Sequence, residues 1–101
     1  MSETIYPSCA VKAMTSADTE YTIALPPGTV YFTVKSRDGT AFRLAFATGK
    51  VAGSVEPYFT IGSGGSYTSP EKMDWSGTLY VACASPSKTV EVIFWTKTPV
   101  S

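Results

Sequence analysis

The sequence contains no histidine, and this absence excludes a large part of enzyme chemistry. Pairs of serine or cysteine with histidine need the imidazole as a base, and many metal sites need it as a ligand. The eight acidic residues mostly fall in turns or on polar strand faces, where carboxylates are usually only solvated. Cys83 has no cationic neighbour in the sequence to activate it as a nucleophile. We therefore expect no catalytic site, no metal and no cofactor.

Charged residues are also scarce, at 16% of the chain, and eight Lys/Arg balance eight Asp/Glu. A domain without net charge exerts no long-range attraction on phosphate backbones or anionic lipid, so nucleic acid and membrane surfaces are not expected partners. No run of eighteen apolar residues is present, and the first fourteen residues lack the pattern of a standard export signal. The sequence thus predicts a protein that neither spans a membrane nor is exported by such a signal.

Cysteine is limited to Cys9 and Cys83. The two could form one bridge, but a cytosolic chain would keep them reduced. We expect two free thiols, with Cys83 filling part of the core.

The dominant pattern in the 101 residues is period-two alternation in short runs, broken about every ten residues by glycine, proline or serine. It predicts strands within residues 21–25, 29–37, 42–46, 58–61, 66–69, 78–84 and 89–97. A chain of this length forms one domain, and seven or eight strands must close one sheet or stack two to bury their apolar faces. The fold class expected is all-β: a small antiparallel β-sandwich or jelly-roll-like barrel with little helix.

Turn residues suggest how these strands are connected. Pro26-Pro27-Gly28 should end the first ladder, and Asp38-Gly39 is typical of a hairpin turn. We therefore expect residues 29–37 to pair with 42–46, with Phe32 and Phe46 facing the core.

The C-terminal half offers a similar pattern. Residues 78–84 and 89–97 are expected to form a second hairpin around 85–88, and Phe59 and Ile61 should point inward. Residues 48–57 indicate a long connection that could cross between sheets. Residues 62–65 indicate a plain turn, and residues 71–77 a loop with one helical turn anchored by Trp75.

The N-terminal residues 1–19 precede the domain of residues 20–101 and allow two interpretations. Ile5, Tyr6, Val11 and Met14 are apolar, and in an arm outside the sheet they would cover a neighbouring molecule. Removing such an arm would leave the fold intact. Alternatively the segment is an edge strand of the same sandwich, in which Pro7 would be tolerated.

Several aromatic residues are expected to face outward. A stripe of them could stack on sugar rings, although such residues more often cover core edges or form subunit contacts. Together with the N-terminal residues they make up the candidate protein-contact set: Ile5, Tyr6, Val11, Met14, Tyr31, Tyr58 and Trp75.

Four segments carry a resemblance to a known group: YTIALPPGT at 21–29, RLAF at 43–46, SGTLYVA at 76–82 and VEVIFW at 90–95. Their order resembles that in small virion proteins of tailed bacteriophages, over about residues 20–96. The resemblance implies a β-sandwich accessory protein of the virion, either a capsid decoration (cement) protein or a head-to-tail or tail fitting.

The resemblance also implies no substrate and no cofactor. It implies the major capsid protein or another virion protein as partner, a homo-oligomer with a trimer favoured, and assembly in the host cytoplasm. The rival interpretations are a carbohydrate-binding sandwich that uses the exposed aromatics and, third, a toxin-like or inhibitory binding domain.

Overall fold

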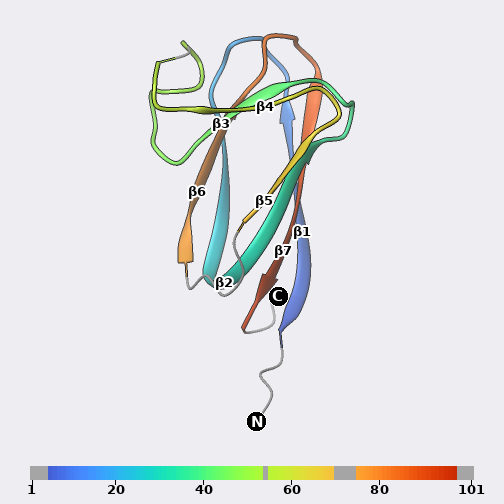
Figure 1. Cartoon of the computed structure of the whole chain (residues 1–101), viewed down its shortest axis with the longest axis vertical. Coiled ribbons are helices and arrows are strands. Elements are labelled where there is room, and N and C mark those ends of the chain that lie inside the picture. The colour runs from blue at the N-terminus through green and yellow to red at the C-terminus, as the bar shows by residue number, and fades with distance from the viewer. Residues whose placement is uncertain (1–4, 54, 70–74, 98–101) are drawn as a thin grey trace.

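The computed structural model describes residues 5–53, 55–69 and 75–97. Its seven strands are β1 (Tyr6–Met14), β2 (Tyr21–Ser36), β3 (Phe42–Ala45), β4 (Phe59–Ile61), β5 (Ser66–Thr68), β6 (Trp75–Ala82) and β7 (Lys88–Thr96). All pairs are antiparallel, in the order β1-β7-β2-β6-β3-β4, with β5 also on β2 (Figure 1). The described residues contain no helix, so the all-β prediction is confirmed.

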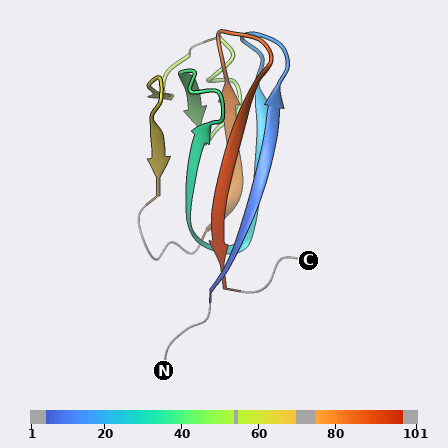
Figure 2. The ribbon, with the colours of Figure 1, turned by 90° about the vertical axis from the view of Figure 1, so that its right-hand side faces the viewer.

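Strand β2 changes partners at Pro26-Pro27-Gly28. Residues 21–25 pair with β6, whereas residues 29–36 pair with β7 and, at 33–35, with β5. Thr29, at the change of partners, also lies opposite Trp75 of β6. The prolines cannot donate to a ladder, and Gly28 has a φ of 85°, which favours glycine. The resulting U-shaped course of β2, in cyan and teal, is visible in Figures 1 and 2. The predicted end of the first ladder is confirmed.

The two halves of β2 therefore belong to two layers, β1–β7–β2–β5 and β2–β6–β3–β4. Apolar side chains of both layers meet in one core. The first layer contributes Phe32, Val34, Val90, Val92 and Phe94, and the second Ile23, Leu25, Phe42, Leu44, Leu79 and Val81. This arrangement is a β-sandwich whose layers are joined through β2.

Both predicted hairpins are wrong. β3 pairs with β6 and β4, and β6 does not pair with β7. Residues 29–36 already have β7 on one side and β5 on the other, so no edge is left for β3. The turn at Asp38-Gly39 instead carries the chain to the other layer, and the Asp38 carboxylate accepts a bond from Thr89 N at 2.9 Å. Residues 83–87 make the return crossing to β7.

The core confirms most of the predicted inward faces. Phe32 is 1% exposed and Ile61 is also buried. Phe46, however, is 56% exposed and Phe59 55%, so their inward placement is wrong. Phe46 is exposed because β3 ends at Ala45, and the alternation of inward and outward side chains ends at the same residue.

The connection between β3 and β4 is long, as predicted, but it does not cross between layers. It joins two antiparallel neighbours, β3 and β4. The carboxylate of Glu20 fixes it by accepting bonds from Thr48 Oγ1 at 2.6 Å and Gly49 N at 2.9 Å.

The loop predicted at residues 71–77 is wrong in part. Residues 75–77 belong to β6, whereas residues 71–74 lie outside the described part of the chain. The turn predicted at residues 62–65 is present, with Gly64 at a φ of 75°.

The N-terminal segment is an edge strand, the second of the two alternatives. β1 pairs with β7 along all nine of its residues, from Tyr6 opposite Thr96 to Met14 opposite Lys88. The interpretation as an arm that covers a neighbour is thus wrong for residues 6–14.

Candidate protein-contact surface

The solvent-facing side of β1, β7 and the second half of β2 is here called the outer face. The strand registers place Cys9, Ile93 and Thr33 in one row across it, and Val11, Glu91 and Lys35 in the next. The side chains of Cys9, Val11 and Ile93 are exposed. They line a shallow hollow of about 220 Å³ between β1 and β2. The outer face is therefore largely apolar along its β1 side.

Charge on the outer face is neutralised locally. Glu91 accepts a bond from Arg37 Nε at 2.9 Å and lies 3.8 Å from Lys35 Nζ. Such partly exposed ion pairs contribute about 0–1 kcal/mol each to stability. Their main effect here is that Glu91 does not stand as an isolated anion beside Val11.

Tyr31 and Trp95 lie opposite each other on β2 and β7, at the end of the outer face where β1 begins. Their rings stack with centroids 5.6 Å apart and planes at 28°. Each ring thus covers one face of the other, and both side chains are half-buried. A sugar-stacking platform needs ring faces open to the ligand, and this pairing removes part of that area.

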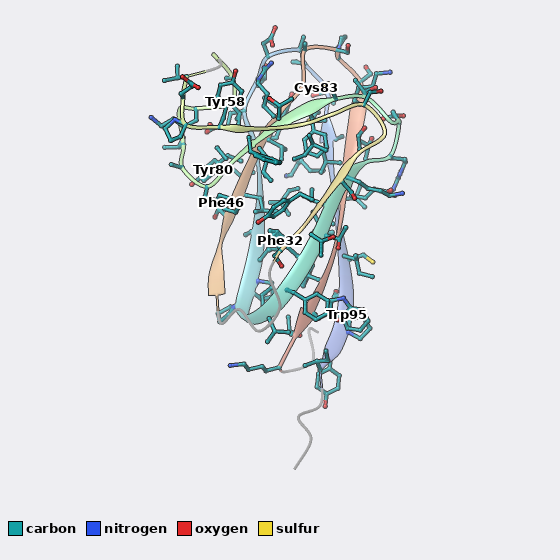
Figure 3. All side chains as sticks on the ribbon, in the orientation of Figure 1. Phe32, Phe46, Tyr58, Tyr80, Cys83 and Trp95 are labelled. Carbon is teal, nitrogen blue, oxygen red and sulfur yellow. The ribbon has the colours of Figure 1, made fainter. Side chains whose placement is uncertain are left out.

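A second apolar region lies around β3 and β4 and is here called the β3–β4 patch. Its members are Phe46 and Phe59, whose side chains are 56% and 55% exposed. Phe46 and Phe59 border a hollow of about 380 Å³ whose other lining residues include Leu44, Pro57 and Tyr58. Figure 3 shows Phe46 and Tyr58 on the same side of the sandwich. Exposed apolar patches of this kind commonly mark contacts with other molecules.

The structure separates the predicted contact residues. Val11 and Tyr31 share the outer face, and Ile5 and Tyr6 are half-buried at the start of β1. Tyr58 packs against a small cluster of Ala45, Val51 and Ala82.

Two of the predicted contact residues cannot be assigned to an exposed surface: Met14 is buried, and the side chain of Trp75 is not described. Met14 is 0% exposed and belongs to the main core, so its assignment to a contact surface is wrong. Its backbone still follows the β1 alternation, and the side chain points into the sandwich. Trp75 begins β6 opposite Thr29, and its side chain lies outside the described part of the chain.

Sequence reasoning missed the β3–β4 patch. Period-two alternation assigned Phe46 and Phe59 to the core because each shares its phase with a buried neighbour, Leu44 or Ile61. Ala47-Thr48-Gly49, directly after Phe46, is a sequence signal that the strand has ended.

The acidic residues that the structure describes mostly have structural partners. Asp18 pairs with Arg43 Nη2 at 2.8 Å, and Glu20 and Asp38 each accept bonds that hold loops. Within residues 5–53, 55–69 and 75–97, no three His, Cys, Asp or Glu side chains gather as a metal site would require.

The Tyr21 hydroxyl closes the connection between β1 and β2. It shares a hydrogen bond of 3.0 Å with Thr15 Oγ1 and accepts one of 2.9 Å from Ser16 N. These bonds, that of Thr15 first, lower the pKa of Tyr21 below the ordinary tyrosine value. The side chain thus anchors a loop.

The two cysteines are free, as expected, and differ in exposure. Cys83 is 1% exposed, and its Sγ donates to Ala41 O at 3.3 Å. We expect alkylation of the folded protein to modify Cys9 within minutes and Cys83 only after denaturation, because reagent access follows exposure. Mass spectrometry of Cys9→Ser should then show no fast adduct. An intramolecular disulfide, or fast modification of Cys83, would contradict this assignment.

In the part of the chain that the structure describes, no helix has the length and apolar character needed to cross a bilayer.

Comparisons with known proteins give few matches. No family model and no curated protein matches the chain. A solved structure from work on Bacillus endospore appendages, described there as a novel family of disulfide-linked pili, is similar at 16% sequence identity, with a TM-score of 0.47 over 95% of this chain and 91% of that one.

Proposed function

We propose that this chain is a non-catalytic structural protein that acts by binding other protein surfaces, specifically as a decoration protein on the capsid of a tailed bacteriophage. It would be made in the host cytoplasm and incorporated into the virion. A head-to-tail or tail fitting is the second location consistent with the same chemistry.

The observation that carries the proposal is the β3–β4 patch. Phe46 and Phe59 are exposed aromatic side chains beside an apolar hollow, and burial of large aromatics supplies much of the energy of protein contacts. The capsid as partner is supported by the resemblance of residues 20–96 to small virion proteins.

The balance of charge supports a protein partner over other classes. Eight positive and eight negative residues give no field that would recruit nucleic acid or anionic lipid. For glycans, the stacking of Tyr31 on Trp95 reduces the open aromatic area of the outer face.

The test is co-sedimentation with phage capsid shells that lack the protein. The wild-type chain should pellet with shells, and Phe46→Asp should lower the bound fraction at least about tenfold, as expected for a residue worth more than 1.4 kcal/mol at a contact. Because Phe46 is exposed, the variant should still fold. The matched control is Thr22→Asp. Thr22 is exposed and lies in the first half of β2, at the edge of the same layer opposite to β4, so this variant should bind like wild type.

Failure of the wild-type chain to pellet with shells would remove the capsid proposal. Equal binding by Phe46→Asp would exclude the β3–β4 patch as the contact. Retention on a glycan array, abolished by Trp95→Ala, would favour the carbohydrate-binding alternative.

A further inference from the structure

β1 has one paired and one open edge. It pairs with β7 along its length, and no other strand among the described residues pairs with it. β1, in blue, lies at the outer margin of the molecule in both ribbon views (Figures 1 and 2). An open strand edge offers backbone groups to another strand.

The direction of these groups follows from two hydrogen bonds on β7. Arg37 N donates to Thr89 O at 2.8 Å, and Lys97 N donates to Gly28 O at 3.0 Å. The backbone N–H and C=O groups of the odd-numbered residues of β7 therefore point toward β2. Backbone groups alternate in direction along a strand, and the even-numbered residues of β7 therefore face β1. The registers Val90–Lys12 and Val92–Ala10 are then the hydrogen-bonded pairs.

It follows that the odd-numbered residues of β1 direct their N–H and C=O groups to the open edge. Cys9, Val11 and Ala13 each offer one donor and one acceptor there. Pro7, which has no N–H, lies in the same phase, where it removes no bond to β7. The open edge is thus a short ladder of three complete residues, bounded by a proline.

We propose that this edge pairs with β1 of a second copy of the chain, antiparallel, with Val11 on the two-fold axis. In this register Val11 pairs with Val11 of the second copy, and Cys9 with Ala13 of the second copy. Every donor of Cys9, Val11 and Ala13 then meets an acceptor, and Pro7 stays outside the ladder.

Two-fold registers with the axis at Cys9, Ala10, Lys12 or Ala13 are worse. An axis at Ala13 pairs Val11 with Thr15, whose carbonyl already accepts a bond from Ser87 N at 3.3 Å. An axis at Cys9 or Ala10 places Pro7 opposite Val11 or Ala13 and leaves a carbonyl without a donor. An axis at Lys12 places two ammonium groups on directly opposed residues, and β1 has no acidic residue to compensate. With Val11 on the axis, Lys12 lies opposite Ala10 of the second copy.

The side chains support the same pairing. Cys9, Val11 and Ala13 are exposed, small and apolar, and Val11 is 54% exposed. Proteins protect strand edges with lysine, proline, bulges or inward-pointing charges. β1 carries Pro7, which ends the ladder, and Lys12, which shares the phase of the buried Met14, so the outward side chains of Cys9, Val11 and Ala13 are uncharged. Joining two copies makes a continuous apolar stripe that includes Ile93 of each.

The first test is the size of the protein in solution, by light scattering and analytical ultracentrifugation. The wild-type chain should be a dimer, and Val11→Lys should weaken dimerisation at least about tenfold, because it places two lysines on the axis. Thr60→Lys, an exposed residue of β4 in the other layer, should dimerise like wild type. Thermal melts of dilute samples check that both variants fold.

The second test is disulfide trapping in a Cys9→Ser background. Directly opposed residues of a hydrogen-bonded pair have Cα atoms about 5.5 Å apart, within reach of a disulfide. Val11→Cys should therefore form a linked dimer on mild oxidation. Ala13→Cys should not, because the two copies of residue 13 lie about 13 Å apart along the strands.

A wild-type chain that is monomeric at about 1 mM, or a trimer as the virion resemblance implies, would overturn the inference. So would linkage of Ala13→Cys in place of Val11→Cys. The inference does not rest on the proposed function, since neither test uses shells, and shell binding can fail while the dimer persists.

Discussion

Replacing Phe32 with alanine should lower the free energy of unfolding by about 3–5 kcal/mol, the usual cost of removing a buried phenylalanine side chain. Phe32 is 1% exposed and lies in the main core, where its ring contacts that of Tyr67 with centroids 5.9 Å apart. A domain of this size has about 5–15 kcal/mol of stability, so the loss is a large share. Urea denaturation followed by tryptophan fluorescence would measure it.

The control is Phe46→Ala, the same chemical change at a 56% exposed side chain. Surface substitutions usually change stability by less than about 0.5 kcal/mol, so the two variants should differ by at least about 2 kcal/mol. If Phe32→Ala and Phe46→Ala were equally stable, the assignment of these two faces would be wrong.

Deleting residues 1–15 should abolish cooperative unfolding, because the deletion removes the whole β1–β7 ladder and the buried side chain of Met14. Met14 is 0% exposed, and truncating a buried methionine to alanine alone costs about 2–5 kcal/mol. The added loss of nine paired residues should exceed what a marginal domain can tolerate. Differential scanning calorimetry should show no transition.

Two controls test whether the loss of stability comes from the pairing of β1 and the burial of Met14, and not from removal of the first residues or from any change in the strand. Deletion of residues 1–4 removes none of the β1 pairs and should leave the transition in place. Val11→Ala, at an exposed position of the same strand, should cost far less than Met14→Ala. A truncated chain lacking residues 1–15 that melted like the parent would restore the interpretation of the segment as a free arm.

Part of the candidate surface could be predicted from the sequence, and part could not. Tyr31 lies on the outward side of β2 as expected, because alternation within a regular strand fixes the side on which each residue lies. Val11 is exposed too, but it had been expected in an arm outside the sheets and lies instead on the outward side of β1. Met14 and Phe46 were assigned to the wrong side. Met14 had been placed outside the sheets altogether, and Phe46 lies one residue beyond the end of β3.

The sequence by itself determined the fold class, most of the strands and the alternation of faces in β2, β6 and β7. These properties depend on residues close together in the chain: the alternation of apolar side chains, and turn residues such as Pro26, Gly28 and Gly39 with their particular backbone angles.

Only the tertiary structure decided which strands are neighbours. Asp38-Gly39 and residues 85–88 reverse the chain as their composition requires, but a reversal can close a hairpin or carry the chain to the opposite layer. The outcome depends on which edges are already occupied, here on β5 and β7 flanking the second half of β2. Edge occupancy arises from contacts between residues far apart in sequence, and for the same reason the open edge of β1 could be identified only once β7 was known to be its partner.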